Sequence, residues 1–259
     1  MTGNVSAVFL FEWRRSLTLP RMAWWGVLAV FPVFIVGLIR FTAYQSPPRE
    51  VWTWLFFALV PMLVAMLGTL LWTTPAISAE LERRSWVYLA VRPNGGTAVV
   101  LGKYLAAVTW VIPPALLGLS IAVPLADTGD GWRIWWTMVR LLCLSCPAYG
   151  AIYLLLGILL PRRAMVLAVA YTLIFELVIA WVPAVINKLT IQYRLRAILM
   201  QWCDLSDIGG RRSGVLALIG DDPAWQHVVI LMLIPPALLL VAVLILRWSE
   251  FSASAESDV

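Results

Sequence analysis

Six long apolar runs divide the chain, and each is long enough to cross a membrane as a helix. A helix needs about 20 mostly apolar residues to cross the hydrocarbon core of a bilayer. The runs cover residues 22–41, 51–74, 99–126, 134–160, 164–184 and 227–248. The pattern predicts an all-α, polytopic membrane protein with six transmembrane helices in one domain over residues 22–248. Only Pro161-Arg162-Arg163 separates the fourth and fifth runs, which predicts a tight antiparallel hairpin.

Residues 1–21 precede the first run and carry an amphipathic pattern. Val5, Val8, Phe9 and Trp13 share one face of a helix, and the basic residues Arg14 and Arg15 lie off that face. This pattern predicts a helix that lies in the cytoplasmic interface of the membrane. The alternative is a first span that simply begins early, with a frayed end.

The segment over residues 185–226 separates the fifth and sixth runs and is too long for a simple connection. A helical stripe runs through it beside three basic residues, and the stripe comprises Ile191, Leu195, Ile198, Leu199 and Trp202. We expect short helices that pack on the outer mouth of the bundle or dip into it. A loop without fixed structure is the alternative.

The positions of Lys and Arg predict that both termini are cytoplasmic. These residues concentrate beside the cytoplasmic ends of membrane spans. With the N-terminus inside, the inner segments hold Arg14, Arg15, Arg21, Arg83, Arg84, Arg92, Lys103, Arg162, Arg163 and Arg247. Outside the long 185–226 loop, the outer ends then hold only Arg40, Arg49, Arg133 and Arg140. Residues 249–259 form a cytoplasmic tail in this orientation.

Composition supports a protein that is embedded in the lipid bilayer. Hydrophobic residues make up 62% of the chain and charged residues 13%, whereas soluble domains are about half apolar and about a quarter charged. The mean hydropathy is +0.88. The net charge of +5 is spread beside the apolar runs, so we interpret it as a topology signal and expect no nucleic-acid partner.

The connection between the second and third runs is the most charged part of the predicted cytoplasmic side. Ile77 and Leu81 lie on one face of a short predicted helix, and Glu80 and Arg84 are four residues apart, in the favoured order for a pair. Arg92-Pro93-Asn94-Gly95 ends the segment in a turn. Such a helix could dock a soluble partner. It could also simply hold the inner end of the spans in water.

The same segment resembles the type-2 permeases of ABC transporters. The pattern in that family is Ile-x-x-Glu-x-Glu, an apolar stretch that ends in Pro, and Gly-Lys at the start of the third span. The matching residues are Ile77, Glu80, Glu82, Pro93, Gly102 and Lys103. Arg84-Ser85 stands where the family usually has Gly-Thr. The N-terminal Phe11-Glu12-Trp13-Arg14-Arg15 and Leu19-Pro20-Arg21 are also similar to the entry segment of the family.

The resemblance implies a permease subunit in the inner cell membrane that exports an unidentified substrate. A separate ATP-binding subunit would supply the work, and a second copy or a sister permease would complete a dimer. The helix between spans two and three would couple the subunits, with Glu80, Glu82, Arg83 and Arg84 as contact residues. The chain itself lacks a phosphate-binding loop, because Gly96 to Gly102-Lys103-Tyr104 has the wrong spacing and Tyr in place of Ser or Thr. We therefore expect no cofactor in this chain and ATP only on the partner.

Two charged residues fall well inside predicted spans, away from the ends. Arg140 lies in the fourth run and Glu176 in the fifth, each several residues in from the predicted outer end. Because the two runs form a hairpin and an unpaired charge in lipid is costly, we expect a structural ion pair between them. A polar lining of a substrate path is the alternative.

Other classes of function lack the residues that they need. Cys143 and Cys146 share a face of the fourth run, but two thiolates make an incomplete metal site and the only His, His227, is far away in sequence. We expect no metal. No nucleophile has a base beside it, so an enzyme is disfavoured. A secondary transporter or a membrane scaffold without transport activity remains the alternative.

Overall fold

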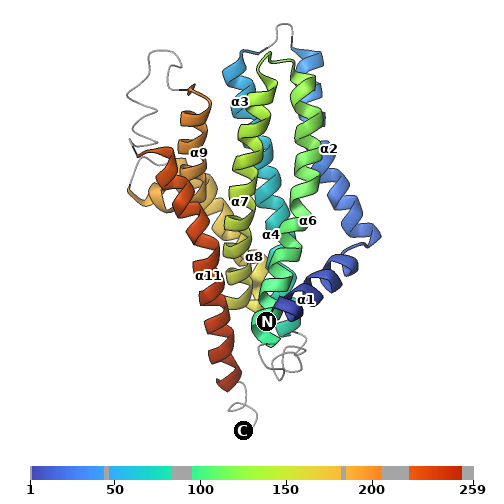
Figure 1. Ribbon diagram of the computed structural model, residues 1–259, viewed down its shortest axis with the longest axis vertical. Coiled ribbons are helices and arrows are strands. Elements are labelled where there is room, and N and C mark those ends of the chain that lie inside the picture. Colours follow the sequence, from blue (N-terminus) through green and yellow to red (C-terminus); the bar gives the residue numbers. More distant parts are fainter. Residues whose placement is uncertain (1, 44–46, 83–94, 182–184, 206–221, 253–259) are drawn as a thin grey trace.

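The structure is a computed structural model that describes residues 2–43, 47–82, 95–181, 185–205 and 222–252. In these ranges the chain forms helices and turns and contains no strand. The α-helices are α1 (Thr2–Arg15), α2 (Leu19–Thr42), α3 (Arg49–Phe57), α4 (Ala65–Glu82), α6 (Gly95–Ala126), α7 (Gly131–Leu159), α8 (Ala164–Tyr171), α9 (Ile191–Trp202) and α11 (Ala224–Ser252). They form one elongated bundle (Figure 1).

Five helical stretches among the described residues are long and apolar enough to cross a membrane. These stretches are Leu19–Thr42, Arg49–Glu82, Gly95–Ala126, Gly131–Leu159 and Ala224–Trp248. They confirm five of the six predicted runs as long helices. The protein is therefore all-helical in its described parts, and its apolar helices indicate a multi-pass membrane protein.

The second stretch joins α3 to α4 through a π-helical segment, η1 (Ala58–Val64), which contains Pro61. Proline has no N–H and its ring clashes with the carbonyl one turn earlier, so a widened turn accommodates it without ending the helix. α4 then continues to Glu82. The start of the predicted coupling helix, residues 77–82, is therefore the last part of a long helical stretch. Residues 83–94 lie outside the described residues.

The fifth predicted run, residues 164–184, is not one long helix. α8 passes into a π-helical segment, η3 (Thr172–Val178), and a 3₁₀ turn, η4 (Ile179–Trp181). A second 3₁₀ turn, η5 (Val185–Leu189), precedes α9. Together, α8 and α9 follow the length of α7 in separate pieces (Figure 1).

α9 packs into the bundle beside one half of α7. Gln192, in its first turn, donates a 2.8 Å hydrogen bond to the hydroxyl of Tyr149 in the middle of α7. At its other end, the carbonyl of Trp202 accepts a 3.0 Å hydrogen bond from Arg133 near the start of α7. Nearly every side chain from Ile191 to Met200 is buried. The short helix expected here is present, and residues 206–221 of the same segment lie outside the described residues.

The core lies among α4, α6 and α7, with α2 and α11 at the periphery (Figure 1). The apolar windows of the three central stretches are 61% to 72% buried, against 17% for α2 and for α11. α4 and α7 approach closely at Gly157, where an added Cβ would lie 2.5 Å from the carbonyl oxygen of Thr74. Membrane helices pack well through such small residues, because apolar surface alone gives no preference for protein over lipid.

α1 lies across α6 at the end of the bundle where α4 and α11 end and α6 and α8 begin (Figure 1). We call this the α1 end, and the opposite end, where α3 begins, the α3 end. The ring of Trp13 meets that of Trp110 edge to face, with centroids 5.2 Å apart. Leu10 and Phe11 on the far side of α1 are 56% and 63% exposed. This two-sided burial agrees with the expected amphipathic helix, and a break at residues 16–18 separates it from α2.

Candidate functional site

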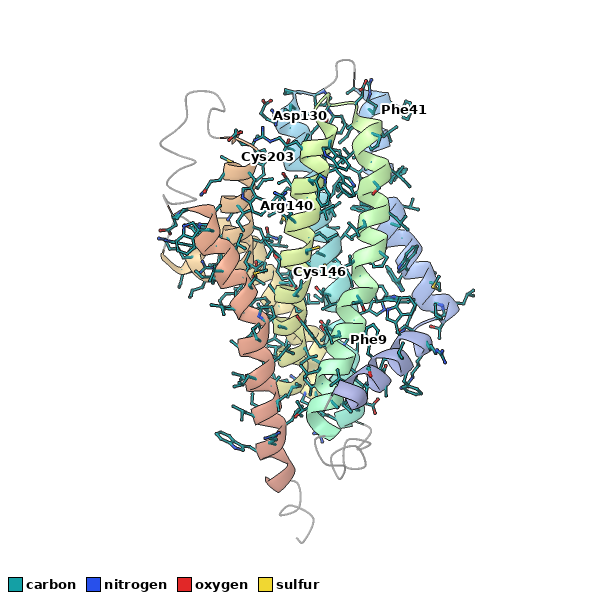
Figure 2. All side chains as sticks on the ribbon, viewed as in Figure 1. Phe9, Phe41, Asp130, Arg140, Cys146 and Cys203 are labelled. Carbon is teal, nitrogen blue, oxygen red and sulfur yellow. The ribbon has the colours of Figure 1, made fainter. Side chains whose placement is uncertain are left out.

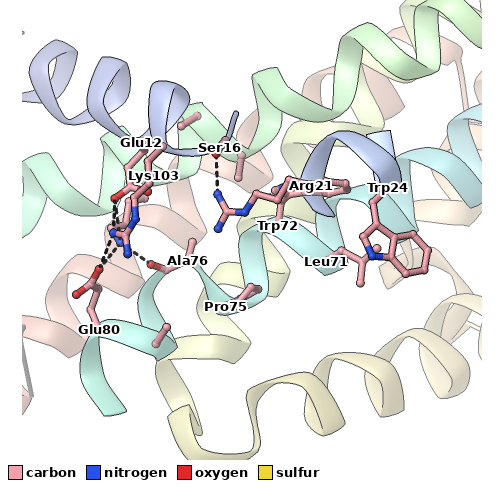
Figure 3. A pocket seen from close by; sticks show the side chains of 14 residues that line it. Glu12, Ser16, Arg21, Trp24, Leu71, Trp72, Pro75, Ala76, Glu80 and Lys103 are labelled. Carbon is pink, nitrogen blue, oxygen red and sulfur yellow. Dashed lines mark hydrogen bonds and ion pairs between the residues drawn. The ribbon is translucent and has the colours of Figure 1, made fainter. Parts of the chain in front are cut away.

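Three helices bring acidic and basic side chains together at the α1 end. The ammonium of Lys103 on α6 lies 2.9 Å from a carboxylate oxygen of Glu80 on α4 and 3.3 Å from one of Glu12 on α1 (Figure 3). Arg15 of α1 lies 3.9 Å from the Glu12 carboxylate and 4.0 Å from that of Glu80. We call Glu12, Arg15, Glu80 and Lys103 the three-helix charge cluster.

The pairing of Lys103 explains how a buried cation is stable here. Its side chain is only 8% exposed, and burying an unpaired ammonium costs several kcal/mol. The Lys103 ammonium has three N–H donors. It donates to Glu80 at 2.9 Å and to the carbonyl of Ala76 at 3.0 Å, and its charge is also paired with Glu12 at 3.3 Å. The cluster therefore ties α1 and the last turns of α4 to the start of α6.

Gly102 gives the same junction its close packing. An added Cβ at Gly102 would lie 2.7 Å from a methyl carbon of Val8 and 3.2 Å from the backbone nitrogen of Phe9. Only glycine lets α1 lie this near to α6 without displacement. The pair Gly102-Lys103 thus supplies a contact surface and an ionic attachment for α1 in consecutive residues.

Glu82 lies outside the cluster, in an open groove at the α1 end. The groove has a volume of about 440 Å³ and is lined by Leu81, Glu82, Leu160, Pro161, Arg162 and Arg163. It lies between the end of α4 and the turn that joins α7 to α8. Glu82 and both arginines are exposed, so this surface offers both signs of charge to solvent. Arg83 and Arg84, the other two predicted contact residues, lie outside the described residues.

Glu176 lies in a second polar cluster, inside the bundle. It is fully buried, and its carboxylate accepts hydrogen bonds from the hydroxyls of Tyr171 at 2.8 Å and Tyr149 at 3.4 Å. It also accepts the backbone N–H groups of Ile191 at 3.3 Å and Gln192 at 3.0 Å. These two N–H groups belong to the first turn of α9, where no carbonyl within the helix can accept them.

The carboxylate of Glu176 therefore caps α9 from another part of the chain. The side chain of Thr190 accepts the N–H of Tyr193 and completes the first turn. A negative charge at a helix N-terminus is favourable, because the aligned peptide dipoles place partial positive charge there. Both the charge of Glu176 and the free N–H groups of α9 are satisfied by one contact.

Arg140 does not join Glu176. It is exposed in the half of the bundle toward the α3 end, between Asp130 and Cys146 in height (Figure 2). Its guanidinium carbon lies 5.5 Å from the centre of the Trp202 ring, at the distance of a cation–π contact. The expected ion pair of Arg140 and Glu176 is therefore absent from the salt bridges of the described residues.

Comparison with known proteins leaves the residues and their geometry to indicate function. The sequence matches no protein-family model, and no curated protein matches it. The chain therefore has to be interpreted from its own contacts.

The structure brings together residues that the sequence did not connect. Glu12 and Lys103 stood in separate motifs and now join Glu80 in one cluster. Arg196 is 4% exposed and donates to the carbonyl of Ala180, which ties η4 to α9. The helical stripe of α9 indicated that the helix is buried, but it could not show that Arg196 points inward.

Among the described residues, no group of three His, Cys, Asp or Glu could hold a metal.

Proposed function

We propose that this chain is the membrane-spanning permease subunit of an ATP-driven ABC transporter of the type it resembles. It exports a substrate that the sequence does not identify, and it uses ATP only through a separate ATP-binding subunit. Its membrane is the cytoplasmic (inner) membrane. A second copy of the chain, or a sister permease, completes the transporter.

The observation that carries this proposal is the convergence of Glu12, Glu80 and Lys103. They come from the three separate segments in which the resemblance was found, and those segments lie far apart in sequence. In the structure the Lys103 ammonium lies 2.9 Å from the Glu80 carboxylate and 3.3 Å from the Glu12 carboxylate. A chance likeness in short motifs would not require the matched charges to meet.

The cluster also gives the proposal a mechanical basis. The segment that would contact the ATP-binding subunit includes Glu82, in the last turn of α4. A push on this segment reaches α6 through Glu80 and Lys103, and α1 through Lys103 and Glu12. A coupling element has to be rigid and charge-complementary, so that closure of an ATPase moves whole helices and not one loop.

The arrangement of the helix ends supports six crossings with both termini on one side. α1 begins and α11 ends at the α1 end, where α4 also ends, α6 begins and the α7–α8 turn lies (Figure 1). A chain that starts and finishes at one end crosses an even number of times. We therefore infer that α8 and α9 together make the one remaining crossing, the fifth along the chain. The excess of Lys and Arg supports a cytoplasmic location for the α1 end.

One observation favours a second candidate, a secondary transporter. Such proteins often carry a broken helix with a charged residue inside the membrane, and Glu176 lies at the break between α8 and α9. Its carboxylate, however, already accepts four hydrogen bonds within the chain. We therefore rank this candidate below the permease.

The decisive experiment is purification of the chain from its native membrane in mild detergent, with ATP hydrolysis measured on the eluate. We expect a copurified protein that binds ATP, and hydrolysis that falls when Glu82→Lys reverses the charge in the open groove. Glu50→Lys is the matched control, because Glu50 lies at the opposite end of the same helical stretch.

Two outcomes would overturn the permease proposal. One is the absence of any ATP-binding protein from the purified complex. The other is equal loss of the ATPase in Glu82→Lys and Glu50→Lys, because a general folding defect and not a contact would then explain it. Transport in vesicles driven by an ion gradient alone, without ATP, would favour the secondary transporter.

A further inference from the structure

A cavity of about 360 Å³ opens at the α1 end, at the corner between α1 and α2 (Figure 3). Its wall is formed by α1, α2, α4 and α6, so it lies between the N-terminal helix and the body of the bundle. One side holds the three-helix charge cluster. The other holds the aromatic and apolar side chains of Trp24, Leu71 and Trp72 (Figure 3). Arg21 and Ser16 lie between the two sides (Figure 3).

The charges in this cavity do not balance. Three cations, Arg15, Arg21 and Lys103, face two carboxylates, Glu12 and Glu80. Lys103 is held at short distance by both carboxylates, whereas Arg15 is at 3.9 Å and 4.0 Å from them. Among the described residues, Arg21 makes no salt bridge, and its single hydrogen bond goes to the hydroxyl of Ser16 at 2.8 Å.

Arg21 is therefore a cation with unused donors beside an apolar wall. A guanidinium carries five N–H donors in a planar fork that matches phosphate oxygens. One bond to Ser16 leaves most of them available. The net positive charge of the cavity suits a ligand group with one negative charge.

We propose that this cavity binds the phosphodiester head group of an anionic membrane lipid. Arg21 and Arg15 hold the phosphate, and the acyl chains leave the cavity along the apolar wall. This proposal does not depend on the transporter assignment, because it uses only the cavity and the apolar helices.

The position of Arg21 selects a lipid over a soluble phosphate ester. It lies in the first turn of the apolar helix α2, where a spanning helix leaves the hydrocarbon core and lipid phosphates are found. Leu17, Leu19 and Trp24 around it are 56%, 88% and 55% exposed. Exposed apolar side chains next to a cation suit an amphiphile, and they would serve no purpose for a small soluble anion.

The test is a titration of the purified full chain in detergent, followed by native mass spectrometry. Three probes separate the parts of the ligand: short-chain phosphatidylglycerol, glycerol 3-phosphate and diacylglycerol. We expect phosphatidylglycerol to bind more tightly than either of the others by at least about tenfold, because only it has both the phosphate and the chains.

Variants then locate the site. Arg21→Gln removes the charged donor and is expected to weaken phosphatidylglycerol binding about tenfold, the loss of one charge-assisted hydrogen bond. Arg40→Gln, at the other end of the same helix, is the matched control and retains wild-type affinity. Arg21→Lys keeps the charge without the planar fork and is expected to fall between them. Ala79→Leu fills the cavity and gives a second loss that does not depend on charge.

Two outcomes overturn the proposal, and the melting temperature of the variants is the control. Equal affinity of wild type, Arg21→Gln and Ala79→Leu for phosphatidylglycerol would place any lipid elsewhere. Glycerol 3-phosphate binding as tightly as the lipid would identify a soluble phosphate ester as the ligand. An unchanged melting temperature in both variants ensures that a lost lipid reflects the site and not unfolding.

Discussion

Replacing Glu176 tests the contact that holds α9 in the bundle. The carboxylate accepts four hydrogen bonds, two from backbone N–H groups of α9 and two from tyrosine hydroxyls. Glu176→Gln keeps the shape but leaves one accepting oxygen, and Glu176→Ala leaves none. Both changes are made at a side chain with no exposed surface.

The size of the effect follows from the number of donors left without an acceptor. Oε1 accepts from Tyr171 and Ile191, and Oε2 from Tyr149 and Gln192. Glutamine therefore loses acceptors for two donors whichever way its amide turns. Each buried donor without a partner costs about 1–3 kcal/mol, and removal of the carboxylate's desolvation cost offsets part of this. We expect a net loss of about 2 kcal/mol for Gln and about 4 kcal/mol for Ala, which also leaves a cavity.

The assay is hydrogen–deuterium exchange of the purified chain, with peptides that cover residues 185–205. Local opening that is easier by about 2 kcal/mol speeds exchange about 30-fold. We expect this acceleration in the first turn of α9 in Glu176→Gln, and more in Glu176→Ala. Peptides from α4 serve as an internal reference, and Glu50→Gln controls for loss of a glutamate elsewhere.

The same measurement decides between the two accounts of Glu176. If an ion pair with Arg140 stabilised it, Arg140→Gln would accelerate α9 exchange as much, and the double variant would cost no more than one single change. The structure predicts a loss of only about 0.5–1 kcal/mol for Arg140→Gln, from its contact with Trp202, and additive effects within about 0.5 kcal/mol. Wild-type exchange in Glu176→Ala, or strong coupling to Arg140, would refute the capping geometry.

Three further changes probe the packing of the helices. Lys103→Met leaves Glu12 and Glu80 without their shared cation and is expected to destabilise the protein by about 2–4 kcal/mol. A melting curve measures this loss, and partial recovery of stability on adding Glu80→Gln is the control. Gly102→Val forces α1 off α6 at a cost of about 1–3 kcal/mol, which faster proteolysis of residues 2–15 would reveal. Arg133→Ala removes the bonds to Trp202 and Asp204 at an exposed site, so a change in melting temperature beyond about 4 °C would contradict its exposure.

The hydrophobic pattern predicted most of the fold, because a long apolar helix can be recognised from the length of its apolar run alone. Five of the six runs are long helices, and their described ends fall within a few residues of the predicted ones except where α4 continues to Glu82. The extension of α4 could not be seen, since residues 77–82 carry charge and end the apolar run. The amphipathic face with Val8 and Trp13 was visible, because a helix that packs on one side has to alternate at helical spacing.

The site was harder to predict because it depends on where helices bend. The expected pair of Arg140 and Glu176 rested on two straight spans of equal depth. In the structure, η3 and η4 change the course of the chain at Glu176 itself, and α9 comes to lie against the carboxylate. Residue spacing does not predict a π-helical turn, and the helix that Glu176 caps begins fifteen or sixteen positions further along the chain.

The two polar clusters lie in parts of the bundle that differ in regularity, and this difference bears on how a permease could move. Lys103 joins α1, α4 and α6 where their backbone is continuous, so these helices should shift together at the α1 end. Glu176 instead holds short helices together across a break between regular helices.

Under the proposed function, force that enters through α4 would meet its first deformable joint between α8 and α9. The contact most exposed to that strain is then the Glu176 cap. If Glu176→Gln slowed transport while leaving ATP hydrolysis intact, this division of the bundle into a rigid part and a joint would be supported. Equal loss of both activities would show that the α8–α9 joint and the charge cluster act as one unit.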